Sequence, residues 1–340
     1  MRSISQLNTL INQAIAETKY PSTPKELYEP ISYLMDLGGK RLRPASVLMA
    51  CNLFSEDIDK AVKPALAIEV FHNFTLMHDD IMDKAPIRRG KPTVHAKWND
   101  NVAILSGDVM LVEAYKLIMQ VDPAILFDVL NIFNDTAIGV CEGQQIDMNF
   151  ETIENVDEGQ YMNMIRLKTA VLLGAALKIG SLVGGASAKN ANLLYDYGVH
   201  LGIAFQLHDD ILDVYGDPKK FGKQIGGDII SNKKTFMVIK AKELAYGETK
   251  TELEKWLKIN DNPSEKVAVI TKIYSQLGVK KLAEQEMAAH AEYAIKSLAL
   301  VSVEESKKEI LGSFADSLLV RALTNMMISL LLIIACLEHH

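Results

Sequence analysis

The sequence predicts an all-α fold built as one large helical bundle. Two long stretches, residues 124–217 and 264–340, contain no proline, and proline is the residue that interrupts helices most strongly. Apolar residues recur there at helical spacing, as at Leu126, Val129 and Phe133, and no sustained alternation typical of strands is present. Breaks between helices are expected at residues 38–39, 85–93, 121–123, 155–159, 184–189, 216–232 and 260–264, where glycine, proline and short polar residues gather.

Length alone leaves one or two domains open, because 340 residues exceed the usual size of a single domain. No low-complexity linker separates two halves, so we expect one domain over residues 1–336. The last four residues, LEHH at 337–340, resemble an expression-tag remnant. A hydrophobic fraction of 49% and a charged fraction of 23% are ordinary for a soluble globular protein, and the net charge of −7 gives no reason to expect nucleic acid as a partner.

The cysteines and the apolar segments bear on location. Cys51, Cys141 and Cys336 are odd in number and scattered without CxxC spacing, which favours a reducing compartment over a disulfide framework or a zinc site. Residues 2–16 lack the apolar core of a signal peptide, so a cytoplasmic protein is expected. Residues 326–336 are strongly apolar but shorter than the roughly 20 residues that a membrane span needs, so no span is expected.

Three aspartates, Asp79, Asp80 and Asp83, end an apolar segment whose spacing predicts a buried helix. Asp79 and Asp83 lie four positions apart, so both carboxylates leave one face of the helix and are close enough to hold one hard cation. Without a cation the two charges repel each other. Taken alone, the pattern equally fits a solvated helix end with Lys84 as a partner.

The aspartate motif occurs twice. Residues 205–213, FQLHDDILD, repeat FTLMHDDIMD at residues 74–83 almost letter for letter and supply Asp209, Asp210 and Asp213. Asp209 follows Asp79 by 130 positions, which leaves room for several intervening helices. Two like-charged clusters on apolar helices indicate that one cationic ligand is shared between them.

Basic residues accompany the first aspartate motif on both sides. GGKRLRP at residues 38–44 places three cations in four positions after a glycine pair, and RRGK at residues 88–91 follows the motif directly. Arginine offers a planar fork and lysine a point charge to phosphate oxygens. Each patch alone could be a solvated basic turn. Strong acid beside strong base indicates metal ions and a polyphosphate together.

Two further stretches carry polar groups in otherwise apolar surroundings. GQQID at residues 143–147 and Lys168-Thr169 both interrupt helical segments. A lone lysine there often reaches solvent, but threonine can also bond to a helix carbonyl and bend the helix, which would place the lysine in a cavity. Residues 217–235 are rich in glycine and lysine and are suited to a mobile lid over phosphate.

From Gly38 to Thr235 the chain resembles the trans-isoprenyl diphosphate synthases, the family of farnesyl and geranylgeranyl diphosphate synthases. The paired DDxxD motifs, GGKRLRP and RRG carry the resemblance in this order. It implies an all-α bundle around a deep central cavity, usually a homodimer, that condenses isopentenyl diphosphate with allylic diphosphates. Two positions depart from the family pattern: Asn232 stands where glycine is usual, and the apolar C-terminal run replaces a basic tail.

The resemblance also implies roles for individual residues. Asp79, Asp83 and Asp209 would ligate three Mg²⁺ ions when diphosphate is bound, with Asp80, Asp210 and Asp213 in support. The residues that would bind the isopentenyl diphosphate are Lys40, Arg43, His72 and Arg89. Those that would bind the allylic diphosphate are Arg88, Lys168, Lys223 and Lys233. Thr169 and Gln206 would face the developing allylic cation.

Histidines on apolar helices are more often packed than catalytic. His72 lies seven positions, two helical turns, before Asp79 and so on the same face, which favours a functional role. His78 and His208 each precede an aspartate pair, and for both we expect a structural role.

Product length is expected to depend on the side chains one to two turns before Asp79. Phe74 and Phe71 would form the floor of the cavity and Thr75 is small, a pattern that the family associates with products somewhat longer than farnesyl. We therefore expect geranylgeranyl diphosphate, with farnesyl diphosphate close behind. The alternative is that both aromatic residues only fill the core.

Loss of an allylic diphosphate needs charge stabilisation by metal ions and cations, and the resulting carbocation needs a dry apolar cavity. No unpaired base is evident to take the final proton, and the family implies that the departed diphosphate accepts it. Three other readings remain open. They are a class I terpene cyclase, a non-catalytic partner subunit of a prenyl synthase, and an unrelated protein that binds divalent cations.

Overall fold

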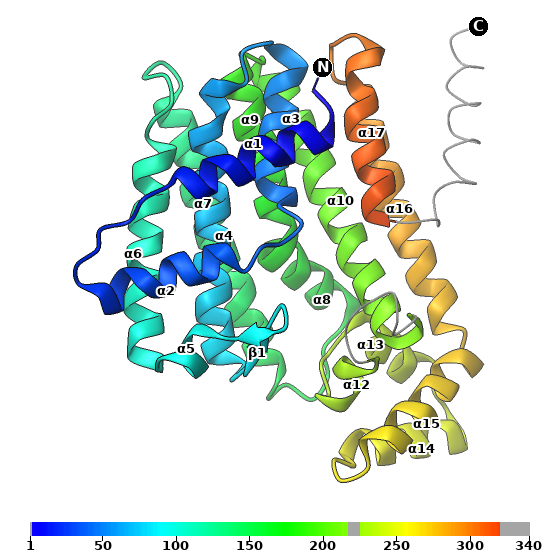
Figure 1. Cartoon of the computed structure of the whole chain (residues 1–340). Coiled ribbons are helices and arrows are strands. Elements are labelled where there is room, and N and C mark those ends of the chain that lie inside the picture. Colours follow the sequence, from blue (N-terminus) through cyan, green and yellow to red (C-terminus); the bar gives the residue numbers. More distant parts are fainter. Residues whose placement is uncertain (1, 217–224, 320–340) are drawn as a thin grey trace, which may run out of the picture. The chain divides into compact units, whose positions relative to one another are not determined.

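The computed structural model describes residues 2–216 and 225–319, and these residues are almost entirely helical (Figure 1). The predicted all-α fold is therefore confirmed. The chain forms two compact units. Unit 1 comprises Met1–Asp135, Leu172–Tyr195 and Leu300–Leu311, and unit 2 comprises Thr136–Val171, Asp196–Ala299 and Gly312–His340. The single domain and the deep central cavity stay predictions.

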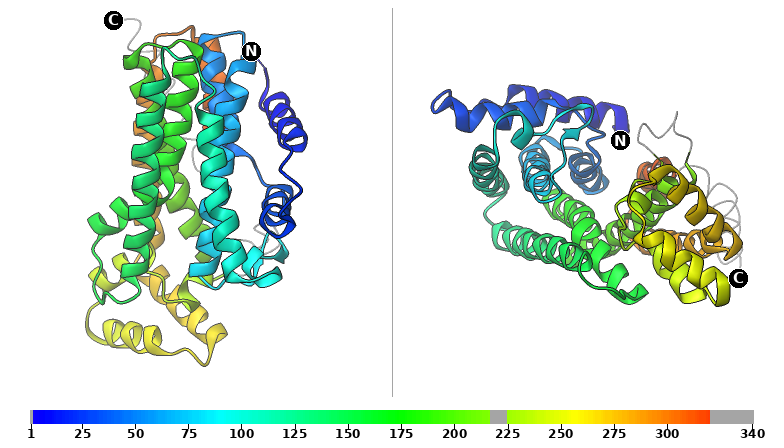
Figure 2. Two further views of the ribbon diagram at one scale, coloured as in Figure 1. Left: turned by 90° about the vertical axis from the view of Figure 1, so that its left-hand side faces the viewer. Right: turned by 90° about the horizontal axis from the view of Figure 1, so that it is seen from below.

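Unit 1 is a layered helical assembly. Its elements are α1 (Ile4–Glu17), α2 (Lys25–Asp36), α3 (Leu42–Phe54), the 3₁₀ turn η1 (Asp59–Ala61), α4 (Val62–Met82), α5 (Val94–Lys97), α6 (Asp100–Ile118) and α9 (Val171–Gly184). Helices α3, α4 and α6 run side by side, and α1 and α2 lie across them, as the end-on view in Figure 2 shows. The first half of α7 (Leu126–Phe150) and the beginnings of α10 (Ala188–Tyr215) and α17 (Glu305–Leu319) also belong to this unit.

Helix α4 packs most extensively against α6 and next against α3. The contact with α6 requires a residue without a side chain, because a Cβ at Gly107 would lie 2.2 Å from Nε2 of His78. Helix α3 is buried on every face from Pro44 to Leu53, and Gly180 of α9 approaches it so closely that a Cβ would lie 2.1 Å from the carbonyl oxygen of Val47. Close backbone approach therefore fixes the position of α4, the helix that carries the first aspartate motif.

A short antiparallel hairpin follows α4, formed by β1 (Ile87–Arg88) and β2 (Lys91–Pro92). Its two turn residues have positive φ angles, 53° at Arg89 and 75° at Gly90. Two consecutive residues with positive φ are typical of the tight turn that suits the twist of a hairpin. The expected break at residues 85–93 is thus a pair of two-residue strands, which are too short for the sequence to show as a strand pattern.

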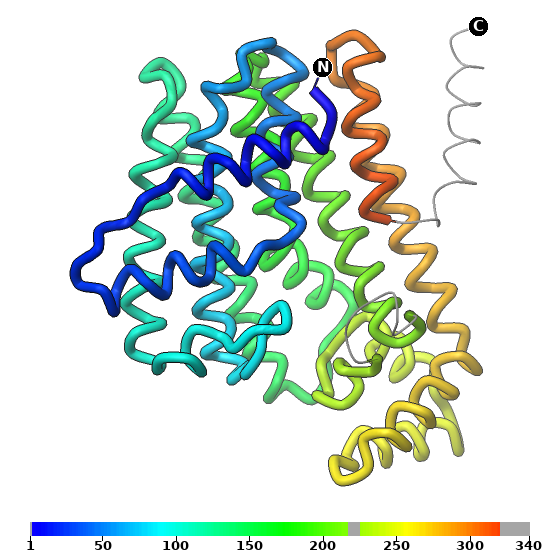
Figure 3. Tube along the Cα trace, viewed as in Figure 1, coloured from blue at the N-terminus to red at the C-terminus, as the bar shows by residue number. Residues whose placement is uncertain are grey.

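Unit 2 contains the second half of α7, α8 (Glu158–Ile165), a π-helical turn η2 (Arg166–Ala170), most of α10, α12 (Gly227–Ile230), α13 (Phe236–Leu244), α14 (Gly247–Lys258), α15 (Pro263–Gln276), α16 (Val279–Ala299) and the end of α17. In Figure 3 the chain can be followed from α14 into α15, which pack against each other as a helical pair. Helix α8 begins with a capping box, in which Asp157 accepts from the backbone of Gln160 and the side chain of Gln160 accepts in return.

Most expected helix breaks coincide with loops of the described chain, including residues 38–39, 121–123 and 260–262. One stretch, Glu158–Gly184, is long and apolar enough to cross a membrane by length and composition, but 67% of its apolar window is buried inside the structure, as in the core helix of a globular protein. Lys223, the apolar run at 326–336 and the sequence LEHH lie outside the described residues.

Candidate active site

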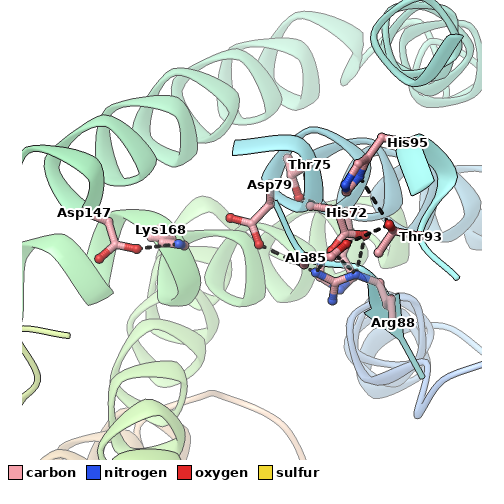
Figure 4. Close-up of polar contacts among 10 residues, drawn as sticks. His72, Thr75, Asp79, Ala85, Arg88, Thr93, His95, Asp147 and Lys168 are labelled. Carbon is pink, nitrogen blue, oxygen red and sulfur yellow. Dashed lines mark hydrogen bonds and ion pairs between the residues drawn. The ribbon is translucent and has the colours of Figure 1, made fainter. Parts of the chain in front are cut away.

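The first aspartate motif occupies the C-terminal end of α4, and its middle residue is buried. Asp80 is only 3% exposed. The guanidinium of Arg88, on β1, donates to both of its carboxylate oxygens, with Nε at 2.8 and 3.0 Å and Nη2 at 2.7 Å. Nη2 also lies 3.7 Å from the Oδ2 atom of Asp79 (Figure 4). Among the described residues, Arg88 of the hairpin is thus a cationic partner of Asp79 and Asp80 in this motif.

Burial alone lowers the pKa of Arg88, but the hydrogen bond to Asp80 and the charges of Asp80, Asp79 and Asp83 outweigh it and raise the pKa. The guanidinium therefore stays charged beside the motif. Asp79 is partly exposed and Asp83 is exposed. The outer two carboxylates of the motif are thus the ones that solvent and ligands can reach.

The side chain of Arg89, the next residue of the hairpin, does not contact the aspartate motif in the way Arg88 does but reaches the glycine pair Gly38-Gly39. Its Nη1 donates to the carbonyl oxygen of Gly38. A Cβ at Gly39, where φ is +136°, would lie 3.0 Å from the guanidinium carbon of Arg89. The glycine pair is needed both for its backbone conformation and for the space that Arg89 occupies. The two basic patches of unit 1, far apart in sequence, therefore meet.

His72 lies within this arginine-rich surrounding. Nη1 of Arg43 lies 3.1 Å from Nε2 of His72. Because a guanidinium only donates, Nε2 of His72 must be the acceptor and hence unprotonated. Burial, followed by the charges of Arg43, Arg89, Arg88 and Arg41, lowers the pKa of His72 well below 6.5. Several positive charges around a neutral imidazole form a site with a strong preference for an anion.

Not every cation of GGKRLRP is available to a ligand. Arg41 is buried, donates to Glu69 and to the carbonyl oxygen of Met35, and so ties α3 to α4 and α2. Lys40 is exposed and, within the described chain, makes no ion pair. The roles predicted for Lys40 and Arg43, with Arg41 left out, agree with these surroundings.

The predicted floor residues lie in an aromatic cluster of unit 1. The ring of Phe71 packs at 5.7 Å from that of Phe74 and at 5.2 Å from that of Phe133. Phe74 also packs against His78, whose Nε2 lies 3.2 Å from the carbonyl oxygen of Ile104. The structural role expected for His78 is therefore confirmed. Thr75 is half-buried and donates to the carbonyl oxygen of His72. The floor itself stays a prediction.

In unit 2 the second aspartate motif lies near the C-terminal end of α10, and again its middle residue is buried. Asp210 is 3% exposed. It accepts hydrogen bonds from the hydroxyl of Tyr161, on α8, and from Nε2 of Gln206 at 3.2 Å. Burial, with the charge of Asp228, raises the pKa of Asp210 to about 7 against the opposing hydrogen bonds. The amide nitrogen of Gln206 therefore donates to Asp210, and the role of Gln206 toward the allylic cation stays a prediction.

Asp213 holds the segment that follows the glycine-rich stretch. Its carboxylate accepts from the backbone N–H of Asp228 at 3.1 Å, and its carbonyl oxygen accepts from the N–H of Gly226. Farther on, Asn232 has a φ of 56°, the left-handed conformation that glycine adopts most readily and asparagine tolerates. The fully buried Lys266 donates to its side chain at 2.7 Å. The departure from glycine at this position thus keeps the backbone geometry, and Lys233 beside it is exposed.

Lys168 lies in the π-helical turn η2 and pairs with Asp147 of α7, with 2.6 Å between Nζ and Oδ2 (Figure 4). A Cβ at Gly143 would lie 2.3 Å from the backbone nitrogen of Lys168, so the two backbones pass in close contact. π-helical turns are rare and often occur at functional sites. The turn is a local departure from α-helix at Lys168-Thr169, where Thr169 is half-buried, and the bend by threonine stays a prediction.

Whether these residues fit Mg²⁺ can be judged from their donor chemistry. Within the described residues no group of three or more histidine, cysteine or carboxylate side chains is placed to hold a metal ion. Mg²⁺ keeps much of its water and is commonly held by one or two carboxylates together with substrate phosphates. Each motif offers hard oxygen donors of this kind in its outer aspartates, Asp79 and Asp83 in one and Asp209 and Asp213 in the other. The donor set therefore fits Mg²⁺ bound together with a diphosphate.

The described residues with predicted roles in binding metal ions or diphosphates, or toward the carbocation, are divided between the two units. Unit 1 contains Lys40, Arg43, His72, Asp79, Asp80, Asp83, Arg88 and Arg89, and unit 2 contains Lys168, Thr169, Gln206, Asp209, Asp210, Asp213 and Lys233. The approach of Asp79 to Asp209 stays a prediction, because the two motifs belong to different units. Sequence reasoning missed Tyr161 and Asp228 altogether. The polar stretch GQQID indicated that Asp147 lies in unusual surroundings, but the sequence did not predict its ion pair with Lys168.

Comparison with known proteins agrees with this chemistry. Residues 24–277 match the polyprenyl synthetase family. The chain belongs to this family.

Relatives whose names state a product indicate which type of enzyme this family member is. The geranylgeranyl diphosphate synthase of Methanosarcina mazei is 42% identical over 242 residues, which are 71% of this chain and 75% of that protein. The geranylfarnesyl diphosphate synthase of Aeropyrum pernix is 40% identical over 228 residues, 64% of this chain and 71% of that protein. A crystal structure of a geranylgeranyl pyrophosphate synthase has a TM-score of 0.91 and 41% identity, covering 94% of this chain and 99% of that one. This polyprenyl synthetase is accordingly a prenyltransferase.

Proposed function

We propose that the protein is a short-chain trans-prenyltransferase that condenses isopentenyl diphosphate with allylic diphosphates and makes chiefly geranylgeranyl diphosphate, with farnesyl diphosphate close behind. The observation that carries the proposal is the pair of near-identical aspartate motifs, each with a buried, clamped middle residue and more accessible outer carboxylates. Two such motifs are suited to bind the metal ions of one diphosphate. A protein that binds a single cation would not need a second motif.

The cationic groups of unit 1 are suited to bind the diphosphate of isopentenyl diphosphate. Arg43, Arg89 and the neutral His72 are gathered around one another, and Lys40 is exposed nearby in sequence. We assign Arg88, Lys168, Lys233 and, outside the described residues, Lys223 to the allylic diphosphate. The ion pairs of Arg88 with Asp80 and of Lys168 with Asp147 keep both cations oriented before a ligand arrives.

Catalysis then follows from the charges and from the exclusion of water. Mg²⁺, when bound, would stabilise the negative charge of the departing diphosphate. Lys168 and Arg88 face oxygens of that same group and stabilise the negative charge that develops on it as the carbon–oxygen bond breaks. The double bond of isopentenyl diphosphate attacks the allylic carbon, a carbon–carbon bond forms, and the departed diphosphate takes the proton. Thr169 and Gln206 present oxygen atoms suited to the carbocation.

The proposal is tested with the purified chain, Mg²⁺, isopentenyl diphosphate and each of three allylic primers of increasing length, followed by mass spectrometry of the products. We expect elongation that stops mainly at the C20 diphosphate and that disappears when the metal is chelated. A cyclic hydrocarbon from the allylic primer alone would instead identify a terpene cyclase. No product from the purified chain, with product restored by a second subunit, would identify a non-catalytic partner.

We also propose a homodimer, supported by an exposed apolar stripe on α6. Leu105 and Val112 on α6, and Met119 directly after its last residue, are exposed and lie seven positions apart, so they follow one side of the helix. An apolar stripe of this length on a helix is suited to a second copy of the chain. The double variant Leu105→Glu/Val112→Glu should shift the mass measured by light scattering from dimer to monomer. A wild-type protein that is monomeric at working concentration would refute the dimer.

The remaining expectations are a cytoplasmic location and the absence of nucleic acid or membrane partners. They stay predictions that fractionation of cells expressing the chain would test.

A further inference from the structure

We propose that Tyr161 is a positioning residue for catalysis, which holds the second aspartate motif and the turn bearing Lys168 in register. The inference rests on the proposed function, because it concerns the residues assigned there to the allylic diphosphate and its metal ions. Tyr161 itself is given no contact with substrate and acts through Asp210.

The hydroxyl of Tyr161 is placed to do this by its burial. Its side chain is 2% exposed and its hydroxyl donates to Oδ2 of Asp210, which is 3% exposed. Oδ1 of the same carboxylate accepts from Gln206 at 3.2 Å. Gln206 lies on α10 with Asp210, whereas Tyr161 lies on α8. Of these two side-chain donors, only Tyr161 joins a second helix to the aspartate motif.

Helix α8 continues directly into the π-helical turn that carries Lys168. Tyr161 therefore links the backbone leading to Lys168 with α10, the helix that carries Asp209 and Asp213. Its partner there, Asp210, lies 49 positions farther along the chain. The lysine and the carboxylates are proposed to meet one diphosphate. The buried hydrogen bond of Tyr161 thus helps to keep opposite charges at the spacing that this ligand requires, and such preorganisation governs how strongly charge is stabilised.

The first motif shows that a clamp of this kind need not be a tyrosine. There the equivalent residue, Asp80, is held by the cationic fork of Arg88. A neutral phenol at Asp210 supplies a hydrogen bond without adding a positive charge beside the second motif. The two motifs are nearly identical in sequence and differ in how they are clamped.

The variant Tyr161→Phe removes the hydroxyl and keeps the ring. Binding is measured without turnover, as the rise in melting temperature when Mg²⁺ is titrated at a fixed concentration of inorganic diphosphate. We expect roughly 10-fold more Mg²⁺ to be needed for half the effect, the change that corresponds to loss of one hydrogen bond to a charged group. In steady-state assays kcat should fall by about 10-fold while KM for isopentenyl diphosphate stays unchanged, because that ligand is assigned to unit 1.

The matched control is Tyr197→Phe, which also removes the hydroxyl of a buried tyrosine. Tyr197 lies on α10, 12 positions before Asp209. It should lose a similar amount of stability without ligand and keep the Mg²⁺ requirement of the wild type. Equal Mg²⁺ requirements and equal kcat in Tyr161→Phe and wild type would overturn the inference. If the wild type binds Mg²⁺ and diphosphate but makes no prenyl product, the proposed function fails, and the Mg²⁺ titration of Tyr161→Phe still tests the inference.

Discussion

Side chains of the same type have different surroundings at the residue scale. Asp79 and Asp80 are neighbours, yet Asp80 is buried in the fork of Arg88 while Asp79 is partly exposed. The same division separates Asp210 from the outer aspartates of its motif. On a helix, adjacent residues point about 100° apart, so one can face the core and the other the ligand. The motif therefore combines a buried carboxylate that anchors the helix end with a more accessible carboxylate beside it.

Phe74 gives a prediction at this scale. It packs against Phe71 and His78 in the aromatic cluster one turn before Asp79. Replacing it with alanine removes most of a large side chain, and if it blocks the cavity the product should become longer by at least one five-carbon unit. Product chromatography of Phe74→Ala against wild type measures this, and the loss of stability should be about 3–5 kcal/mol.

Phe150→Ala is the control for Phe74→Ala, because Phe150 is also buried and has no predicted role in chain length. It should destabilise the protein while leaving the product length unchanged. Unchanged products from Phe74→Ala would show that Phe74 only fills the core.

At the scale of elements, the π-helical turn and α7 fit together through Gly143. A Cβ there would lie 2.3 Å from the backbone nitrogen of Lys168, whereas a Cβ at Gly139, about one turn earlier, would make an ordinary 3.4 Å contact with a side-chain atom of Leu167. Backbone atoms cannot move aside as a flexible side chain can. The position of Lys168 therefore depends on a glycine in another helix.

Gly143→Ala should accordingly destabilise the protein by about 1–3 kcal/mol, as overpacking does, and lower kcat because Lys168 is displaced. Gly139→Ala should be neutral or stabilising by up to about 1 kcal/mol, since alanine favours helix over glycine. Denaturant unfolding of both variants, with kcat measured in parallel, tests the pair. Equal stability of the two variants would contradict the close packing.

Helices α10 and α16 meet through a histidine pair that gives a pH prediction. Nδ1 of His200 lies 2.9 Å from Nδ1 of His290, and Nε2 of His290 lies 3.4 Å from Glu286. Burial, then His200, lowers the pKa of His290 from 6.5 to about 4. The unfolded chain then binds a proton more readily, so stability present above pH 6.5 is lost as the pH falls toward 4.

The loss from His290 is at most about 3 kcal/mol, because each unit of pKa shift corresponds to about 1.4 kcal/mol. Burial raises the pKa of Glu286, and this shift opposes part of the loss because the folded chain then binds a proton more readily. Burial also lowers the pKa of His200, against the charge of Asp196, and this shift adds to the loss. His290→Gln cannot gain a proton and should show a flatter stability profile between pH 6.5 and 4 in urea titrations. A profile as steep as that of the wild type would assign the effect to other groups.

At the scale of the whole molecule, the proposed function depends on two motifs that belong to different units. If Asp79 and Asp209 share metal ions, each single change to asparagine should lower kcat/KM by several orders of magnitude, and the double variant should be little worse than either one. Residues that act as one assembly show such non-additivity. Steady-state kinetics of the four proteins measures it. Additive losses would mean that the two motifs act independently.

The sequence by itself determined the helical fold, the positions of most helix breaks and the two aspartate motifs, because all of these depend on neighbouring residues and regular spacing. It also predicted a role in diphosphate binding for the arginines of RRGK. Only the tertiary structure decided that Tyr161 clamps Asp210, that Asp147 pairs with Lys168 and that Lys266 supports Asn232. These partners lie 21 to 49 positions apart in the chain. Their distances are fixed by the packing of whole helices, which no local pattern of residues records.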